Sequence, residues 1–209
     1  MADSKLSALT ERATEPDSTD EFYLNDSSTS KRILWSTIKT ALGNPSTFTT
    51  TAGAGFTGGV GTIYKNSVVT VGGIITTQIL FDLTGLGSST TDLDIIGTGA
   101  SVAHLGRILA AQQGTILTGT LTCLEVPAGG VTDIDLYSAS ESTGVFDALV
   151  TSLTETALIT AGGAWTLALT KAMGTNVPAA NDYLYLTCGA AGTPGTYTAG
   201  KFLLELKGY

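Results

Sequence analysis

Apolar and polar residues alternate along 63–86, and this is the clearest strand pattern in the chain. Two β-branched runs are separated by Gly72 and Gly73, which tolerate the positive φ angles of a tight hairpin turn. After the turn, the residues predicted to share the apolar side of the strand are Ile75, Thr77, Ile79, Phe81 and Leu83. The residues predicted to lie on the exposed polar side are Thr76, Gln78 and Asp82. A hairpin with one apolar face must pack on another sheet.

Further strand-like runs follow along the chain, and they are predicted at 93–96, 102–110, 115–126, 132–137, 165–170, 183–188 and 201–207. Residues 145–159 fit either a helix or a strand, because Leu149, Leu153, Ala157 and Leu158 match helical spacing while the threonine content weakens a helix. Of the two, we expect a short helix. About eight to ten strands joined by loops indicate a mainly β protein. We therefore expect a β-sandwich of jelly-roll-like kind.

The first 44 residues differ from this body. Residues 1–30 carry scattered apolar side chains without a period, which predicts an extended arm that becomes ordered only by docking on a partner. The next residues predict one short helix, with Ser30 as its N-cap and with Gly43 and Pro45 ending it. The expected partner contacts in this attachment segment, residues 1–44, are Leu6, Leu9, Phe22, Tyr23 and Trp35.

Residues 45–62 are rich in glycine and threonine and predict a flexible linker to a body that spans 63–209. Gly53, Gly55 and Gly58 match the G-x-G-x-x-G string that can hold a dinucleotide phosphate. That motif needs a preceding apolar strand and a following amphipathic helix, and the sequence offers neither. The loop interpretation is therefore favoured, and no cofactor is expected.

The charge pattern excludes several classes of function. The 209 residues have a formal net charge of −8, and only 13% are charged. Between residues 45 and 170, Lys65 and Arg107 stand against nine acidic residues, which disfavours binding to nucleic acid or to an anionic membrane. No apolar run reaches the roughly 20 residues of a membrane span. The first 22 residues lack the apolar segment of a secretory signal, so we expect synthesis in a cytoplasm.

Catalytic signals are weak. His104 is the single histidine, which removes paired-histidine zinc motifs, and its apolar surroundings favour a structural role. The sequence leaves open a catalytic triad whose members meet only in the folded protein, although it contains no nucleophile-elbow motif. Cys123 and Cys188 are expected to be small buried groups rather than a bridge. No catalytic residue is predicted, and we expect a protein that is not an enzyme.

Two acidic pairs are the best candidates for a hard cation, because oxygen ligands two residues apart on a strand project together. They are Asp92 with Asp94, and Asp133 with Asp135. Neither pair fits a calcium loop, so solvated acidic faces are favoured and no metal is predicted.

The amino-terminal segment resembles the leader of virion structural proteins from tailed phages, marine phages above all. The matching motifs are KLSALT at 5–10, PDSTDE at 16–21 and SKRILWSTIK at 30–39. The body is similar to structural proteins of the same phages through VGGIITTQILFDLTGL, LTCLEVPAGG, DIDLYSA, LTETALI and YTAGKFLLELKGY. The resemblance covers most of the chain except the glycine- and threonine-rich segment.

This resemblance implies a capsid decoration (cement) protein on the exterior of the virion. The implied partners are the major capsid protein or other virion proteins, and a homotrimer suits a threefold site on the shell. A tail-fibre or receptor-binding protein that recognises the host surface is the alternative. The short chain, the absence of a repeated shaft and the 7% aromatic content favour the decoration protein.

Overall fold

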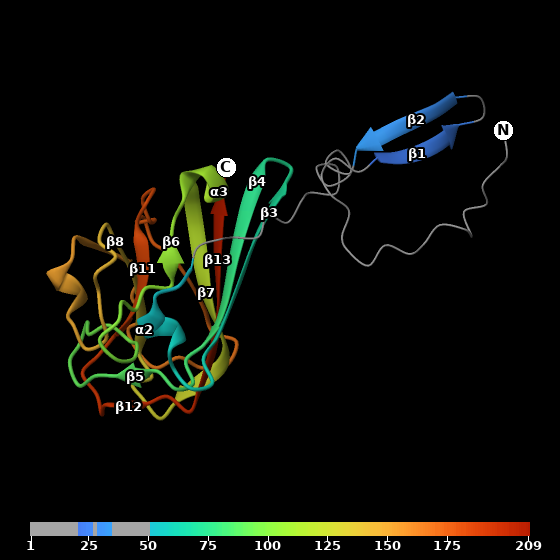
Figure 1. Cartoon of the computed structure of the whole chain (residues 1–209). Helices are drawn as coiled ribbons and strands as arrows, with labels where there is room; N and C mark the ends of the chain where they lie inside the picture. Colours follow the sequence, from blue (N-terminus) through green and yellow to red (C-terminus); the bar gives the residue numbers. More distant parts are fainter. Residues whose placement is uncertain (1–20, 27–28, 35–50) are drawn as a thin grey trace. The chain divides into compact units, whose positions relative to one another are not determined.

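The computed structural model describes residues 21–26, 29–34 and 51–209. The chain divides into two compact units, residues 1–44 and residues 45–209, and the second contains both large sheets (Figure 1). The two units are described separately below.

The body is built on two antiparallel sheets. The five-stranded sheet has the order β10 (Thr170–Ala172), β7 (Ile116–Ala128), β13 (Ala199–Gly208), β4 (Ile74–Asp82) and β3 (Ile63–Val71). The four-stranded sheet has the order β6 (Gly106–Arg107), β11 (Tyr183–Cys188), β8 (Ile134–Ala139) and β9 (Glu155–Ile159). A small sheet pairs β12 (Gly195–Thr196) with β5 (Gly87–Ser88). The short helices are α2 (Ala54–Thr57), α3 (Ala110–Gln113) and the 3-10 turn η2 (Val150–Ser152).

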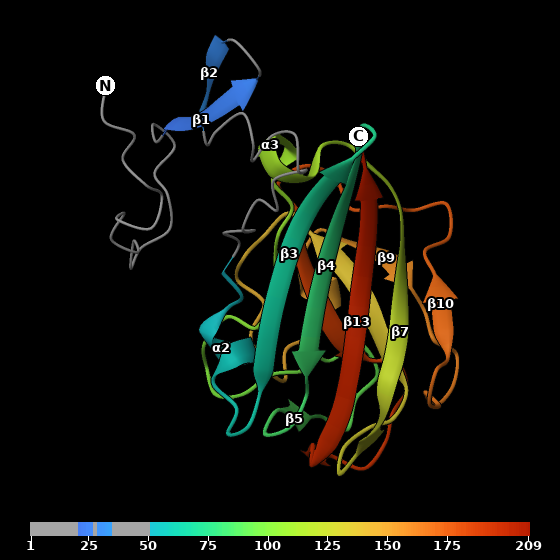
Figure 2. The same cartoon turned by 90° about the vertical axis from the view of Figure 1, so that its right-hand side faces the viewer.

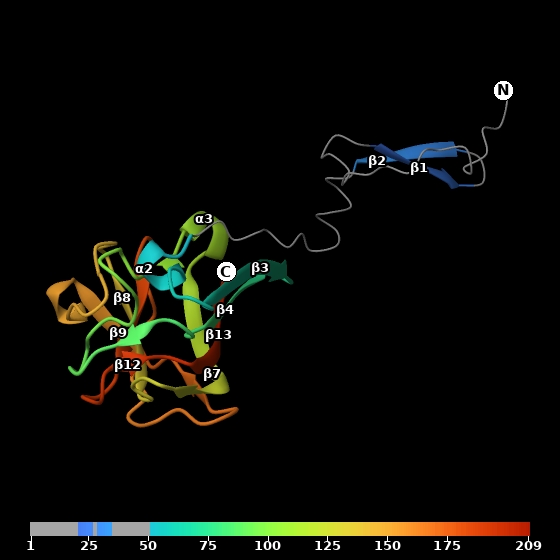
Figure 3. The same cartoon turned by 60° about the horizontal axis from the view of Figure 1, so that its bottom comes forward.

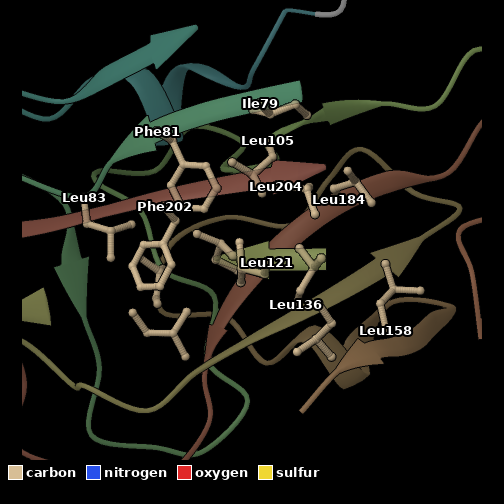
Figure 4. Close-up of a cluster of buried hydrophobic side chains, with 14 of the residues drawn as sticks. Ile79, Phe81, Leu83, Leu105, Leu121, Leu136, Leu158, Leu184, Phe202 and Leu204 are labelled. Carbon is tan, nitrogen blue, oxygen red and sulfur yellow. The ribbon is translucent and has the colours of Figure 1, made fainter. Parts of the chain in front are cut away.

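One hydrophobic core lies between the two large sheets (Figure 4). Phe81, Phe202 and Leu121 enter it from the five-stranded sheet, and Leu136 and Leu184 enter it from the four-stranded sheet. All five side chains are fully buried. The prediction of a mainly β, sandwich-like protein is therefore confirmed.

The predicted hairpin is confirmed as β3 and β4. Gly72 and Gly73 form its turn with φ angles of 58° and 83°, a region that glycine enters without a steric penalty. Thr77, Ile79 and Phe81 are buried, as the alternation predicts. The predicted strands at 183–188 and 201–207 are also confirmed, as β11 and within β13.

Four predicted elements of the body are wrong. The strand predicted at 93–96 does not form, because Leu93 has a positive φ of 69° and only isolated bridges involve Asp94 and Ile95. Residues 145–159 do not form a helix, because Asp147 has a positive φ of 65° and residues from Glu155 onward pair with β8. The predicted strand at 165–170 is a loop, since Ala168 has a φ of 63° and β10 begins only at Thr170. Within 102–110, the one strand is the two-residue β6, and α3 begins at Ala110.

The segment predicted as a linker belongs to the body where the structure describes it, from residue 51 onward. Phe56 of α2 is fully buried and packs edge to face on Phe81, with ring centroids 5.8 Å apart. The N–H groups of Gly53 and Gly55 donate to the carbonyls of His104 and Val102. Those two donors are therefore used inside the protein rather than left for a phosphate, which removes the nucleotide-binding interpretation of the glycine motif.

The described part of the amino-terminal unit is a β-hairpin rather than an extended arm leading to a helix. Strand β1 (Glu21–Asp26) pairs antiparallel with β2 (Thr29–Leu34) over all six residues of each strand. The predicted helix is therefore wrong over 30–34, because this segment pairs with a neighbouring strand of equal length. Its remaining part, 35–42, lies outside the described residues.

Candidate docking face

No further layer of the body's described residues, 51–209, covers the outer face of the five-stranded sheet (Figure 2). Alternation along β4 and β13 turns Gln78, Leu80, Leu203 and Glu205 outward, away from the core. We call this surface the docking face and define it by the outward residues Lys65, Ser67, Val69, Thr76, Gln78, Leu80, Asp82, Thr120, Thr122, Leu124, Glu125, Lys201, Leu203, Glu205 and Lys207.

The centre of the docking face is a shallow apolar hollow of about 430 Å³. Leu80 and Leu203 are direct partners on neighbouring strands, and Leu124 completes the apolar lining. Leu124 reaches this position through a β-bulge, since Phe202 pairs with Cys123 while Lys201 pairs with Glu125. The polar rim of the hollow consists of Lys65, Asn66, Ser67 and Gln78.

Ion pairs border this hollow. Lys201 Nζ lies 3.2 Å from Asp82 Oδ2 and 2.5 Å from Glu125 Oε2. Lys207 Nζ lies 3.6 Å from Glu205 Oε1 on the same strand. Lys65 forms no ion pair within the described residues, so its ammonium group is free to meet a carboxylate of a partner.

The Asp82 carboxylate was predicted to be exposed, yet the residue is only 5% accessible. Burial pushes the pKa of Asp82 upward, but hydrogen bonds from Thr84 and the pairing with Lys201 outweigh it and lower the pKa below 3.8. Hydrogen bonds to Glu125 and Asp82 raise the pKa of Lys201. Both groups therefore stay charged and fix the geometry at this end of the face.

Charge is balanced on the docking face and unbalanced elsewhere on the body. Residues 51–209 contain five basic side chains, and three of them, Lys65, Lys201 and Lys207, belong to the docking face. The same stretch contains eleven acidic side chains, and only Asp82, Glu125 and Glu205 belong to the face. The docking face is therefore formally neutral on a body whose remaining surface is strongly acidic. A neutral surface with an apolar centre suits contact with another protein.

Sequence reasoning missed this surface. Leu203 lies between Lys201 and Glu205 on the side of the strand that alternation marks as polar. Leu124 cannot be placed from the sequence because the bulge that turns it outward depends on pairing with β13. The signal that was available is the position of Leu80 and Leu203, because each is an apolar residue on the polar side of its strand.

His104 lies in an aromatic environment formed by Tyr183 and Tyr185. The residue is 8% accessible, and its ring lies 4.9 Å from the ring of Tyr183. Its Nδ1 is buried and has no hydrogen-bond partner among the described residues, so the carboxylate that orients a catalytic histidine is missing there. Burial lowers the pKa of His104, which favours the neutral ring at pH 7. The expectation of a structural histidine fits this geometry.

Both cysteines are buried and unbridged, as expected. Burial raises the pKa of Cys188 to about 11, and burial also raises the pKa of Cys123. Both thiols are therefore protonated at neutral pH and are poor nucleophiles.

In each acidic pair one member is buried rather than on a solvated face, whereas Asp92 is exposed and Asp133 is half-buried. Asp94 and Asp135 are 4% and 5% accessible, and Asp135 Oδ1 accepts a hydrogen bond from Ala161 N at 2.5 Å. Burial raises the pKa of Asp133 and of Asp135. Within the described residues, no group of three or more histidine, cysteine or acidic side chains could hold a metal ion.

Two of the predicted partner contacts, Phe22 and Tyr23, lie in β1, where they pair with Ile33 and Arg32. The other three, Leu6, Leu9 and Trp35, lie outside the described residues. The contacts predicted for the amino-terminal unit therefore stay predictions, and the docking face belongs to the body alone.

No family model, no curated protein and no solved structure matches this chain. Among the described residues, no helix has the length and apolar character needed to cross a membrane.

Proposed function

We propose that this protein is a structural component of a tailed-phage virion, of the capsid-decoration type, which binds the shell and stabilises it. The docking face carries this proposal, because it is neutral and apolar at its centre on a body that is otherwise acidic. The leader and body motifs that resemble phage virion proteins support the same role. The partner is the major capsid protein or another protein of the shell.

In this role, residues 1–44 supply a second attachment. Many weak contacts on one shell act together, so a docking face of modest affinity still gives high occupancy. An amino-terminal segment that docks at the same time raises the effective concentration of the face at its site. The two units of the chain would then share the work of attachment.

The experiment is reconstitution of undecorated particles with the full chain and with a variant that lacks residues 1–44. We expect the full chain to coat the particles and the shortened chain to lose most of its occupancy, while its circular dichroism still reports a folded β body. Full occupancy by the shortened chain would reject the role of the amino-terminal unit. No binding by the full chain would reject the decoration role itself.

One observation favours the tail-fibre or receptor-binding alternative. A hollow of about 340 Å³ is lined by the Phe146 ring and by the hydroxyl-bearing residues Ser88, Thr98 and Thr196. An aromatic ring beside hydroxyl groups in a site without charged side chains suits a neutral sugar. Copy number in purified virions distinguishes the roles, since a decoration protein approaches the number of shell sites and a fibre protein is present in few copies.

A further inference from the structure

Strand β3 forms one end of the five-stranded sheet and is nine residues long. Figure 3 shows β3 at the margin of the body, next to its hairpin partner β4. Within the described part of the chain, the backbone hydrogen bonds of β3 run to β4 alone. Among the described residues, its other side therefore has N–H and C=O groups without a backbone partner, which is a template for another strand. Thr70 on this side is exposed, Tyr64 and Asn66 are half-buried, and Val68 is 1% accessible.

The other three end strands of the two large sheets are protected from such pairing. β10 has three residues with Lys171 at its centre, and β6 has two residues and includes Arg107. β9 has a register irregularity against β8, and Asn176 Nδ2 donates to the Ala157 carbonyl on this strand. Short length, charge, irregularity and side-chain cover are the features that keep sheet edges from pairing.

β3 lacks most of these features. Its register against β4 is continuous, it contains no proline, and its single charge is Lys65 near the start. Val71, at the other end, is 70% exposed, and Ile63 and Ile74 are 42% and 44% exposed. A long, regular and weakly charged edge with exposed apolar ends is unfavourable for a protein that stays alone in water.

We propose that β3 pairs antiparallel with β3 of a second copy of this chain, around a twofold axis at Ser67. The two-residue turn makes Val71 and Ile74 a pair that exchanges hydrogen bonds. Counting back from Val71, every second residue points its backbone N–H and C=O groups toward β4. The residues between them point these groups toward the open edge of the sheet. The four residues whose backbone groups point toward the open edge are Tyr64, Asn66, Val68 and Thr70.

With this axis, every residue whose backbone groups point toward the open edge pairs with another such residue. Tyr64 meets Thr70 of the second copy, and Asn66 meets Val68, so all nine residues pair and about eight new backbone hydrogen bonds form. On the side of the sheet that carries the docking face, Ile63 meets Val71 and Lys65 meets Val69. No charge faces a like charge, and the exposed apolar ends of the strand cover each other.

The twofold axis stands perpendicular to the sheet, so the docking faces of the two copies lie on the same side. One continuous surface then spans ten strands. The pair differs from the trimer that the resemblance to phage proteins implies. A threefold ring would require β3 to meet a different surface of its neighbour, and the other sheet edges are short or irregular.

Val69 gives a direct test, because it faces Lys65 across the proposed interface. In the full chain, Val69→Lys places like charges opposite each other twice, whereas Val69→Glu places opposite charges there. We expect sedimentation equilibrium to show a dimer for the original chain and a dissociation constant about tenfold higher for Val69→Lys. The dissociation constant for Val69→Glu should equal that of the original chain or fall below it.

Thr120→Lys is the control, since it adds the same charge to the docking face on β7, away from the edge. It should leave the dimer unchanged, and circular dichroism should show that all three variants are folded. A monomer or trimer in the original chain, or equal effects of lysine and glutamate at position 69, would overturn the proposal. The test uses no viral particles, so its outcome is independent of the proposed decoration role.

Discussion

Lys201 of β13 lies directly opposite Asp82 of β4 on the docking face, with Nζ 3.2 Å from Oδ2. Asp82 also accepts hydrogen bonds from the backbone N–H and the hydroxyl of Thr84, at 3.0 Å and 2.7 Å. The ammonium group is shared with Glu125 on the next strand. Three neighbouring strands are therefore tied together at one end of the apolar hollow.

Replacement of Lys201 with methionine should destabilise the body at neutral pH, because the nearly buried Asp82 carboxylate loses its cationic partner. The lowered pKa of Asp82 means that its stabilising contribution is present above the unfolded value, near 3.8, and is lost as pH falls through the folded value. Thermal unfolding at pH 7 should show a melting temperature lower by several degrees, and the difference should shrink at pH 3.

Lys65→Met is the matched control for this prediction, since Lys65 lies on the same face without an ion pair among the described residues. It should change the melting temperature little at either pH. An equal loss of stability for the two variants would show that the Asp82 pair is not the cause.

If the proposed decoration role holds, Leu124→Glu should weaken attachment to the shell without unfolding the body. Leu124 is 44% exposed and helps to line the central hollow, where a carboxylate would have to be desolvated against a partner. Leu149→Glu is the control, because Leu149 is also 44% exposed but lies outside the docking face. Binding to undecorated particles should fall about tenfold or more for Leu124→Glu and stay within about twofold for Leu149→Glu. Equal binding of the two variants would show that the docking face does not take part in attachment.

The hairpin and the last strand were predictable because their two-residue alternation coincides with burial. Along β13, Phe202, Leu204 and Leu206 are fully buried, and the residues between them are partly exposed. The local pattern fails to predict the structure where pairing with another strand or cover by another segment determines it. Ile33 and Leu34 fit a helix by spacing, yet they belong to a strand because β1 lies beside them. The alternation of Asp133 and Asp135 predicted an outward face, but Ala161 and Gly189 cover that side of β8.

The docking face shows the same limit. Its charged and apolar residues come from four strands, β3, β4, β7 and β13, so sequence spacing does not place them together. Leu124 depends on a bulge, and the ion pairs of Lys201 depend on two different neighbouring strands. The sequence indicated the class of fold, whereas the candidate surface needed the register of the sheet.

Gly55→Ala tests whether residues 51–62 belong to the body. A Cβ atom at Gly55 would lie 2.2 Å from the Ser101 carbonyl oxygen, and that oxygen belongs to the backbone and cannot move easily. We expect a loss of about 1–3 kcal/mol in the free energy of unfolding, measured with urea. In a flexible linker, the same change would be neutral or slightly stabilising. Gly174→Ala is the control, because a Cβ atom there meets nothing within 4 Å.

Asp135→Asn should stabilise the protein at neutral pH. Burial, followed by repulsion from Asp133 and Asp92, raises the pKa of Asp135, so the folded state holds this proton more tightly than the unfolded state does. Its contribution to stability is therefore fully present below the unfolded value, near 3.8, and is lost as pH rises through the folded value. Asparagine stays neutral and keeps an oxygen to accept the hydrogen bond from Ala161 N.

Urea unfolding at pH 7 and pH 3 measures this effect. The free energy of unfolding of Asp135→Asn should exceed that of the original chain at pH 7, and the two should converge at pH 3, where the original carboxyl group is protonated in both states. Glu155→Gln on β9 removes the same formal charge from a partly exposed position and should change stability by less than about 0.5 kcal/mol. A stabilisation that persists at pH 3, or an equal gain for Glu155→Gln, would mean that the charge of Asp135 is not what burial penalises.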